Sequence, residues 1–90
     1  MYNYDNMKNI VNKGVGTVKP NFKIGEEVIV NNLVFDKRSN RVNAEMMCYQ
    51  GMKAKIMNIL WDSYDLSFYY LLDIDGGVNK YCYYMLSKVD

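Results

Sequence analysis

The stretch "YYLLDIDGGVNKYCYYML", residues 69–86, predicts two antiparallel strands joined by a tight turn. Residues on both sides of the Gly-Gly pair alternate between two faces, as strands with one buried face do. Two adjacent glycines supply the positive φ angles that a two-residue hairpin turn requires. This turn predicts that Tyr69 lies opposite Tyr84. A three-residue loop is the alternative; it would shift the register by one residue and put Lys80 against Leu72.

The two faces of this hairpin differ in polarity. One face of the first strand carries Asp73 and Asp75, so we expect Tyr69 and Tyr84, which share it, to lie outside or at its rim. We interpret the two carboxylates as solvated turn residues rather than a cation site, and Asp73 faces Lys80 across the strands. The expected core residues on the other face are Phe68, Tyr70, Leu72, Ile74, Tyr81 and Tyr83.

The stretch "MKAKIMNIL", residues 52–60, predicts a further strand. Apolar residues alternate with Lys53 and Lys55, so one face is apolar and the other is charged. The alternation then breaks, because Ile59 is out of phase with Ile56. We therefore predict a β-bulge or a sharp bend between these two isoleucines.

The chain divides into a short N-terminal extension, residues 1–20, and one domain, residues 21–90. The apolar spacing at 7–11 fits one face of a short helix, and the extension is expected to be disordered or loosely docked. Within the domain, 28–30 predicts a strand with its two valines on one face, and 44–48 fits one helical turn.

Composition limits the classes of function. The 90-residue chain is half hydrophobic, which is rich enough to fold as one domain without a metal or disulfides. Eleven Lys and Arg against ten Asp and Glu leave a formal net charge of +1. This balance argues against a DNA mimic, which needs a large acidic excess, and against a global basic field for nucleic acid.

The chain has no histidine, so the commonest general base near neutral pH is missing. Cys48 and Cys82 have no histidine partner and are expected to be reduced thiols. We therefore expect no enzymatic activity, no cofactor and no metal. No signal peptide or bilayer-length apolar run is present, which predicts a cytoplasmic protein without membrane association. Abundant Asn, Lys, Tyr and Ile indicate an AT-rich source, such as a bacterium or its phage.

A resemblance to known proteins rests on "FKIGEEVIV", residues 22–30, followed by a long loop, "YQGMKAKIMNIL" and "FYYLLDIDGGVNKYCYYML". The first segment matches the pattern F-x-[IV]-G-[DE]-x-V-x-V. Together these segments resemble the small SH3-like β-barrels, a group that includes KOW-type and Tudor-type domains and many short phage proteins. The resemblance implies a mainly β fold over residues 22–90, a single SH3-like barrel of about five antiparallel strands. It implies no particular activity.

Two surfaces are candidate binding sites. The first is aromatic, because rings with a polar tip are favoured in protein interfaces and can stack on bases. The second is basic and combines the outer lysines of the strand at 52–60 with the long loop before it. The candidate partner-binding residues are Tyr69, Tyr84 and Trp61 on the aromatic surface and Lys53, Lys55, Arg38 and Arg41 on the basic one.

Three hypotheses follow for function. The first is a protein-binding module, such as a phage or mobile-element protein that inhibits a host defence nuclease in the manner of an anti-CRISPR protein. The second is a nucleic-acid-binding barrel that uses the local basic patch, which a steep salt dependence of binding would indicate. The third is a structural or homo-oligomerising module, which a concentration-dependent mass would indicate.

Overall fold

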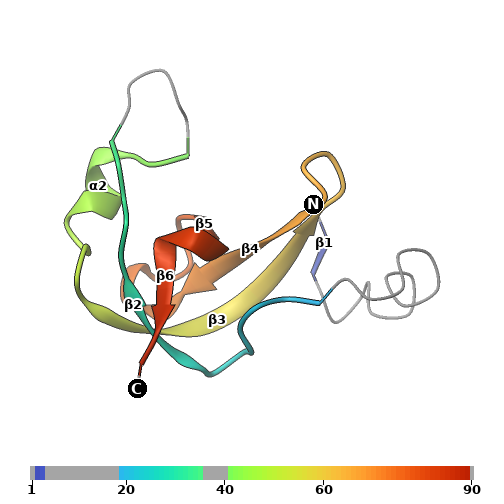
Figure 1. The fold of residues 1–90 in the computed structure, drawn as a ribbon, viewed down its shortest axis with the longest axis horizontal. Coiled ribbons are helices and arrows are strands. Elements are labelled where there is room, and N and C mark those ends of the chain that lie inside the picture. Colours follow the sequence, from blue (N-terminus) through green and yellow to red (C-terminus); the bar gives the residue numbers. More distant parts are fainter. Residues whose placement is uncertain (1, 4–18, 36–40, 90) are drawn as a thin grey trace.

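The computed structural model describes residues 2–3, 19–35 and 41–89, and these residues form a mainly β protein. The paired strands all run antiparallel, in the order β5-β4-β3-β2-β6, with β1 added on β3 (Figure 1). The predicted fold class, mainly β with about five antiparallel strands, is confirmed. The described elements are the strands β1 (Tyr2–Asn3), β2 (Glu27–Val30), β3 (Lys53–Asp62), β4 (Ser67–Leu72), β5 (Tyr81–Cys82) and β6 (Leu86–Lys88), the helix α2 (Ala44–Met47), and the 3₁₀ helices η1 (Asp73–Asp75) and η2 (Tyr83–Met85).

Strand β2 lies between β3 and β6 and presents its apolar face to the core. Val28 and Val30 are fully buried, and Ile29 between them is only partly buried, as the alternation predicts. Val28 pairs with Ala54 of β3 on one side and with Lys88 of β6 on the other. This strand therefore connects the C-terminal end of the domain to its longest strand.

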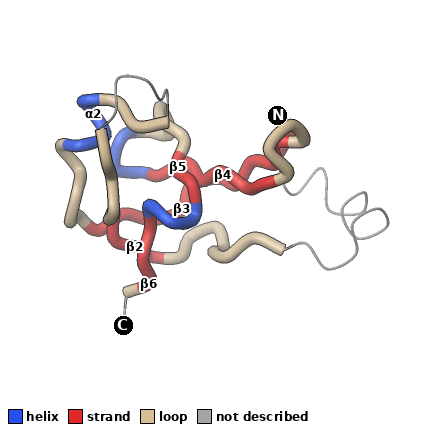
Figure 2. The backbone as a smooth tube through the Cα atoms, turned by 45° about the horizontal axis from the view of Figure 1, so that its top comes forward, coloured by secondary structure: helices blue, strands red, loops and turns tan. Residues whose placement is uncertain are grey.

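Strand β3 contains the predicted bulge. Its register with β4 shifts between Ile56 and Asn58, and the two isoleucines on either side, Ile56 and Ile59, are both buried. Met57 is pushed out to solvent, because the extra residue must leave the alternation for both isoleucines to point inward. Beyond the bulge, β3 and β4 form a hairpin that extends from the rest of the domain (Figure 2).

The connection from β4 to β5 differs from the predicted tight hairpin. Strand β4 ends at Leu72, and η1 and a loop separate it from β5, so Tyr69 pairs with Cys82. Both predicted registers are therefore wrong, the one that puts Tyr69 opposite Tyr84 and the one that puts Lys80 against Leu72.

The Asp75 carboxylate organises this wider loop. It accepts hydrogen bonds from the Gly77 amide at 3.0 Å, Asn79 Nδ2 at 2.9 Å and the Tyr81 hydroxyl at 3.2 Å. Asp73 is also engaged, since its Oδ1 accepts a hydrogen bond from the Lys55 amide at 2.8 Å. Both carboxylates therefore cap backbone and loop groups, and the predicted cross-strand pair of Asp73 with a lysine does not form.

The register differs from the preferred prediction by two residues, which leaves the faces of the strands unchanged. Tyr70, Leu72 and Tyr81 are fully buried, as predicted. Tyr83 is 55% exposed instead of buried, because the chain leaves β5 after Cys82 and enters η2. Ile74, in η1, is only partly buried.

Aromatic contacts hold the two ends of the core. Phe22 packs edge-on against Tyr70 at 5.2 Å between ring centroids, and the Asn21 amide donates to the Tyr70 hydroxyl at 2.8 Å. Trp61 packs against Phe68 at 4.8 Å and is buried. This burial corrects the expectation that Trp61 lies on a partner-binding surface.

The first described residues, β1, pair with β3 at Leu60 and Trp61, beside the β3–β4 hairpin. The predicted helical segment at 7–11 lies outside the described residues. The helical turn predicted for 44–48 is confirmed as α2. Within the part of the chain that the structure describes, no helix has the length and apolar character needed to cross a membrane.

Candidate functional site

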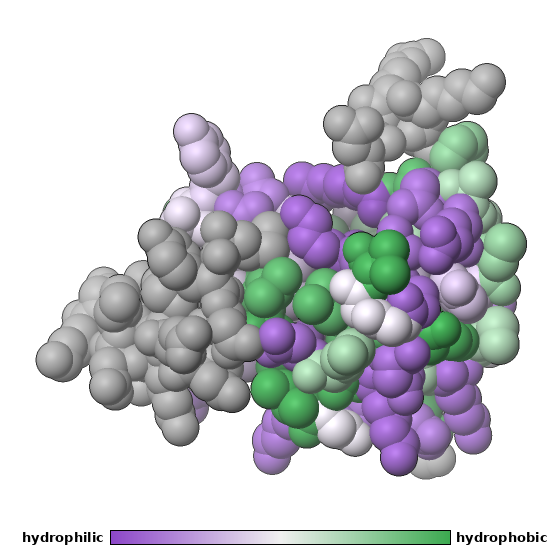
Figure 3. All heavy atoms as spheres, turned by 180° about the vertical axis from the view of Figure 1, so that it is seen from behind, coloured by the Kyte–Doolittle hydropathy of each residue, from purple (hydrophilic) through white to green (hydrophobic). Residues whose placement is uncertain are grey.

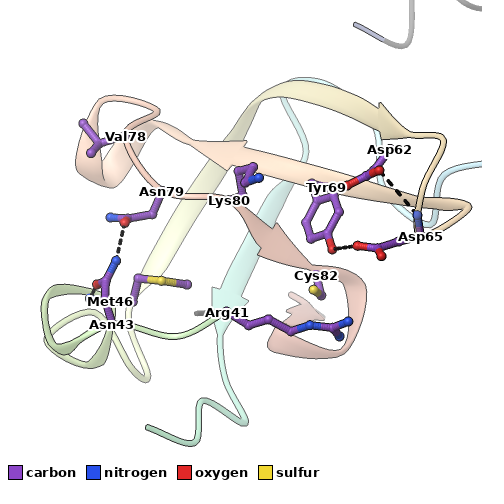
Figure 4. A pocket seen from close by; sticks show the side chains of 10 residues that line it. All are labelled: Arg41, Asn43, Met46, Asp62, Asp65, Tyr69, Val78, Asn79, Lys80 and Cys82. Atoms are coloured by element: carbon purple, nitrogen blue, oxygen red, sulfur yellow. Dashed lines mark hydrogen bonds between the residues drawn. The ribbon is translucent and has the colours of Figure 1, made fainter. Parts of the chain in front are cut away.

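An open groove of about 340 Å³ lies beside β4 and β5 (Figure 4). Its walls come from three regions that are distant in the sequence: the segment around the start of α2, the turn between β3 and β4, and the loop before β5. Tyr69 of β4 lies among them. The lining residues are Arg41, Asn43, Met46, Asp62, Asp65, Tyr69, Val78, Asn79, Lys80 and Cys82.

Tyr69 forms the floor of this groove, and it is only 7% exposed. Its hydroxyl donates a hydrogen bond of 2.5 Å to Asp65 Oδ2, and the ammonium of Lys80 lies 5.3 Å from the ring centroid. Burial raises the pKa of the Tyr69 hydroxyl, and the bond to Asp65 acts in the same direction because it favours the protonated phenol. Tyr69 is therefore buried rather than at the rim, which corrects the prediction.

Arg41 lines one side of the groove and connects it to the tyrosines of η2, which lie outside the groove lining. Arg41 Nη1 donates to the Tyr84 hydroxyl at 3.4 Å, and this hydrogen bond is the main cause that raises the pKa of the guanidinium. Tyr84 is 43% exposed, as predicted, and its ring meets that of Tyr83 edge-on at 5.6 Å. Two exposed rings and a guanidinium thus lie together beside the groove.

The two carboxylates at the hairpin end of the groove support the turn between β3 and β4. Asp62 Oδ1 accepts from the amides of Tyr64 at 2.8 Å and Asp65 at 3.4 Å, as in an Asx turn. Asp65 in turn accepts the hydroxyl proton of Tyr69. These contacts give both aspartates a structural role within the domain.

The opposite end of the groove is held by an asparagine network. Asn43 Nδ2 donates to Asn79 Oδ1 at 2.7 Å, and Asn43 Oδ1 caps α2 by accepting from the Met46 amide at 2.8 Å. Asn79 Nδ2 then donates to Asp75 at 2.9 Å and to Glu45 at 3.4 Å. This network ties the loop before β5 to the start of α2 and so sets the position of one wall.

The structure brings three of the predicted site residues together, Tyr69, Tyr84 and Arg41. Arg41 joins them, because it lines the groove with Tyr69 and donates a hydrogen bond to Tyr84. The predicted cross-strand pair of Tyr69 with Tyr84 does not form. Lys53 and Lys55 line a different groove on β3. Arg38 lies outside the described residues.

The second groove has mixed charge. It contains Glu27 and Asp73 beside the two lysines, and Glu27 lies directly opposite Lys55 in the β2–β3 register. Hydrophobic side chains on the face shown in Figure 3 reach the surface at separate places among polar ones. Because Arg41 lines the first groove and the two lysines line the second, the residues of the predicted basic patch lie at two separate places.

Sequence reasoning missed Lys80, Asp65 and Tyr83 as parts of the site. Lys80 was assigned to the wrong partner because the loop before β5 is longer than a two-residue turn. Asp65 meets Tyr69 only because the β3–β4 turn folds back over β4. Tyr83 points outward because η2 replaces an extended strand.

The side chains that line the groove offer hydrogen-bond donors, hydrogen-bond acceptors and one aromatic ring. Among the described residues, no group of three or more Cys, Asp or Glu is arranged to hold a metal ion. Cys48 is exposed and Cys82 is buried at the groove, and both are free thiols.

Comparisons with protein-family models, curated proteins and solved structures find no significant match for this chain.

Proposed function

We propose that this protein is a non-enzymatic protein-binding module and that it binds through the Tyr84 face, defined as Arg41, Tyr83, Tyr84 and the groove over Tyr69. The observation that carries this proposal is the bond from Arg41 to the Tyr84 hydroxyl at the edge of that groove. It holds a guanidinium and an exposed ring side by side on a folded surface.

The residue types of this face favour a protein partner. Tyrosine and arginine are enriched in protein interfaces and among the residues whose removal costs most binding energy. The ring of Tyr84 touches that of Tyr83, and its hydroxyl accepts from Arg41. Side chains already held in place lose less conformational entropy on binding, so the face is partly preorganised.

The SH3-like assignment is part of the same proposal. The strand order β5-β4-β3-β2-β6, with the 3₁₀ helix η2 leading from one edge strand to the other, supports it. Small size and the absence of histidine support a partner-occupying role over catalysis. The partner class we propose is a host protein, with a defence nuclease as one candidate when the chain comes from a phage.

Nucleic acid is the less favoured partner. Lys53 and Lys55 share their groove with Glu27 and Asp73, which offset their charge. The groove over Tyr69 also contains two carboxylates. A phosphate backbone would meet negative charge at both places.

Affinity capture from the source cell, followed by calorimetry with the purified partner, tests the proposal. We expect Tyr84→Ala to weaken binding by about 30-fold, the factor that corresponds to about 2 kcal/mol for a central interface tyrosine. Tyr64→Ala is the matched control, since Tyr64 is 97% exposed and is not part of the Tyr84 face. Equal affinities of the wild type and the Tyr84 variant would place the interface elsewhere.

A further inference from the structure

We infer that the edge of β3 at Leu60 and Trp61 is a strand-binding site, on which an extended segment of another protein replaces β1. This site lies outside the Tyr84 face, and the inference goes beyond the function proposed above. Recognition here is by backbone hydrogen bonds along a sheet edge, a mode in which a peptide adds one strand to an existing sheet.

The two halves of β3 have different neighbours on the side away from β4. Strand β2 pairs with residues 53–55, and the Ile56 carbonyl accepts from the Gly25 amide at 2.7 Å. On the other side, β4 pairs with β3 as far as Asp62. Of the described strands, only β1 pairs with the second half of β3 on the side away from β4 (Figure 1). The backbone groups of this half-edge therefore take their strand partner from β1.

Strand β1 is a short occupant of this edge. It forms two residue pairs, Tyr2 with Trp61 and Asn3 with Leu60. Strands in globular proteins are usually about five or six residues long, and each further pair extends the ladder of hydrogen bonds. The pairing of β1 is favoured because it belongs to the same chain, so a partner strand must outcompete it through additional pairs. A longer strand in the same register forms those additional pairs.

The register on β3 determines which side chains suit the partner strand. Successive residues of a strand point to opposite faces, and residues directly opposite each other in a ladder share a face. Ile59 and Trp61 are buried, whereas Leu60 between them is only partly buried. The residues opposite Ile59 and Trp61 should therefore be apolar, and the residue between them should be polar. The register of β1 agrees, with Tyr2 opposite Trp61 and Asn3 opposite Leu60.

The edge selects a protein as its partner. Its pairing groups are backbone N–H and C=O groups at the regular spacing of a strand, which an extended polypeptide matches and a phosphate backbone does not. The β3–β4 hairpin that carries this edge extends from the rest of the domain (Figure 2). The partner segment therefore joins the sheet as one more antiparallel strand, in the place that β1 occupies.

Nuclear magnetic resonance titration of the full chain with two peptides tests the inference. The first probe is the octapeptide MYNYDNMK, which repeats residues 1–8 and so contains the β1 sequence. The second probe has the same sequence with N-methyl groups on the amides of its second, third and fourth residues, which removes backbone donors. We expect the first peptide to shift the amide resonances of Leu60 and Trp61, and the N-methylated peptide to leave them unchanged.

The variant Tyr2→Pro removes the competing strand. Proline has no backbone N–H to contribute to a ladder, so β1 no longer occupies the edge. The apparent affinity for the octapeptide should rise, by about tenfold if β1 holds the edge about nine-tenths of the time. Tyr84→Ala is the matched control and should leave octapeptide binding unchanged, because Tyr84 lies outside this site. Thermal melting should show that the Tyr2→Pro variant stays folded.

Each other outcome overturns the inference. Equal affinities of the wild type and the Tyr2→Pro variant mean that the peptide and β1 do not share a site. Equal binding of the N-methylated peptide assigns recognition to side chains instead of the backbone edge. Unfolding of the Tyr2→Pro variant makes β1 an obligatory strand of the domain. Absence of octapeptide binding to both proteins rejects the site, and it leaves binding through the Tyr84 face to be decided by its own experiment.

Discussion

The hydroxyl of Tyr69 donates a hydrogen bond of 2.5 Å to Asp65, and this bond joins the floor of the groove to the turn between β3 and β4. Asp65 lies in the turn beyond the last paired residues of the β3–β4 hairpin, Asp62 and Ser67, so ladder hydrogen bonds between the two strands do not fix its position. The turn is therefore positioned by side chains, first by Asp62 within it and then by Tyr69 beneath it.

Alkaline pH should destabilise the protein through its buried tyrosines. Burial raises the pKa of Tyr69 and Tyr81 above the ordinary phenol value of about 10, and their hydrogen bonds to Asp65 and Asp75 act in the same direction. Above about pH 10 the unfolded chain releases these protons while the folded chain keeps them, so the free energy of unfolding falls as pH rises. Denaturant unfolding between about pH 8 and about pH 11 measures this loss.

The double variant Tyr69→Phe with Tyr81→Phe isolates that effect. It should unfold with a shallower dependence on pH than the wild type, and the comparison cancels contributions that the two proteins share. Tyr64→Phe is the control, because Tyr64 is almost fully exposed. An identical pH dependence in the double variant and the wild type would refute the role of the buried phenols.

Removal of the Asp75 carboxylate should destabilise the loop before β5. We expect Asp75→Ala to lower the free energy of unfolding by at least about 2 kcal/mol, because it leaves the Gly77 amide and the Tyr81 hydroxyl without their charged acceptor and removes the shorter of the two bonds from Asn79 Nδ2. Urea denaturation measures the change. Glu27→Ala, at an exposed carboxylate, should stay within about 0.5 kcal/mol. A wild-type midpoint for the Asp75 variant would show that the loop does not depend on this carboxylate.

A glycine at position 66 should stabilise the protein. Leu66 is exposed and has a φ of 53°, a left-handed conformation that costs an L-residue about 1–2 kcal/mol. Glycine adopts this conformation freely but loses about 0.5–1 kcal/mol more in chain entropy. The net gain expected for Leu66→Gly is therefore about 0.5 kcal/mol.

Tyr64→Gly is the matched control for that substitution, since Tyr64 is exposed in the same turn and is not among the residues with positive φ. It should lower the melting temperature, whereas Leu66→Gly should raise it. If both variants lose stability equally, the strain at Leu66 is not a significant part of the folding free energy.

Truncating core side chains on β3 and β4 should strongly lower the free energy of unfolding. Leu72 and Ile56 are buried on paired strands, and replacing either by alanine should cost roughly 2–5 kcal/mol of stability. This is a large share of the about 5–15 kcal/mol that typically stabilises a domain. Met57→Ala is the control, because the bulge places Met57 in solvent. If chemical denaturation shows the same loss of stability for the core variants as for Met57→Ala, the assignment of the strand faces is wrong.

Local alternation in the sequence determined the strands, their inner faces and the bulge. Val28, Tyr70 and Leu72 lie in the core because side chains in a strand alternate strictly between two faces. The same rule predicted the bulge, since Ile56 and Ile59 can both point inward only if one residue is added between them. These features depend on neighbours within a few positions, which the sequence shows directly.

Only the tertiary structure decided the register of β5 and the composition of the groove. Gly76 and Gly77 do adopt positive φ angles, as a tight hairpin would require. The carboxylate of Asp75, however, binds Asn79 and Tyr81 and so stabilises a wider loop. Turn propensity of the glycines alone does not include these contacts, and they shift the register by two residues.

The groove depends on contacts that span much of the chain. Arg41 donates to Tyr84, which lies 43 residues further along the chain, whereas Asp65 meets Tyr69, only four residues away, at the end of the β3–β4 turn. Arg41 and Tyr84 are too far apart in sequence to share a local pattern. Only the tertiary fold brings these two side chains together. Composition therefore indicated tyrosine and arginine as binding residues, but it did not show which of them meet.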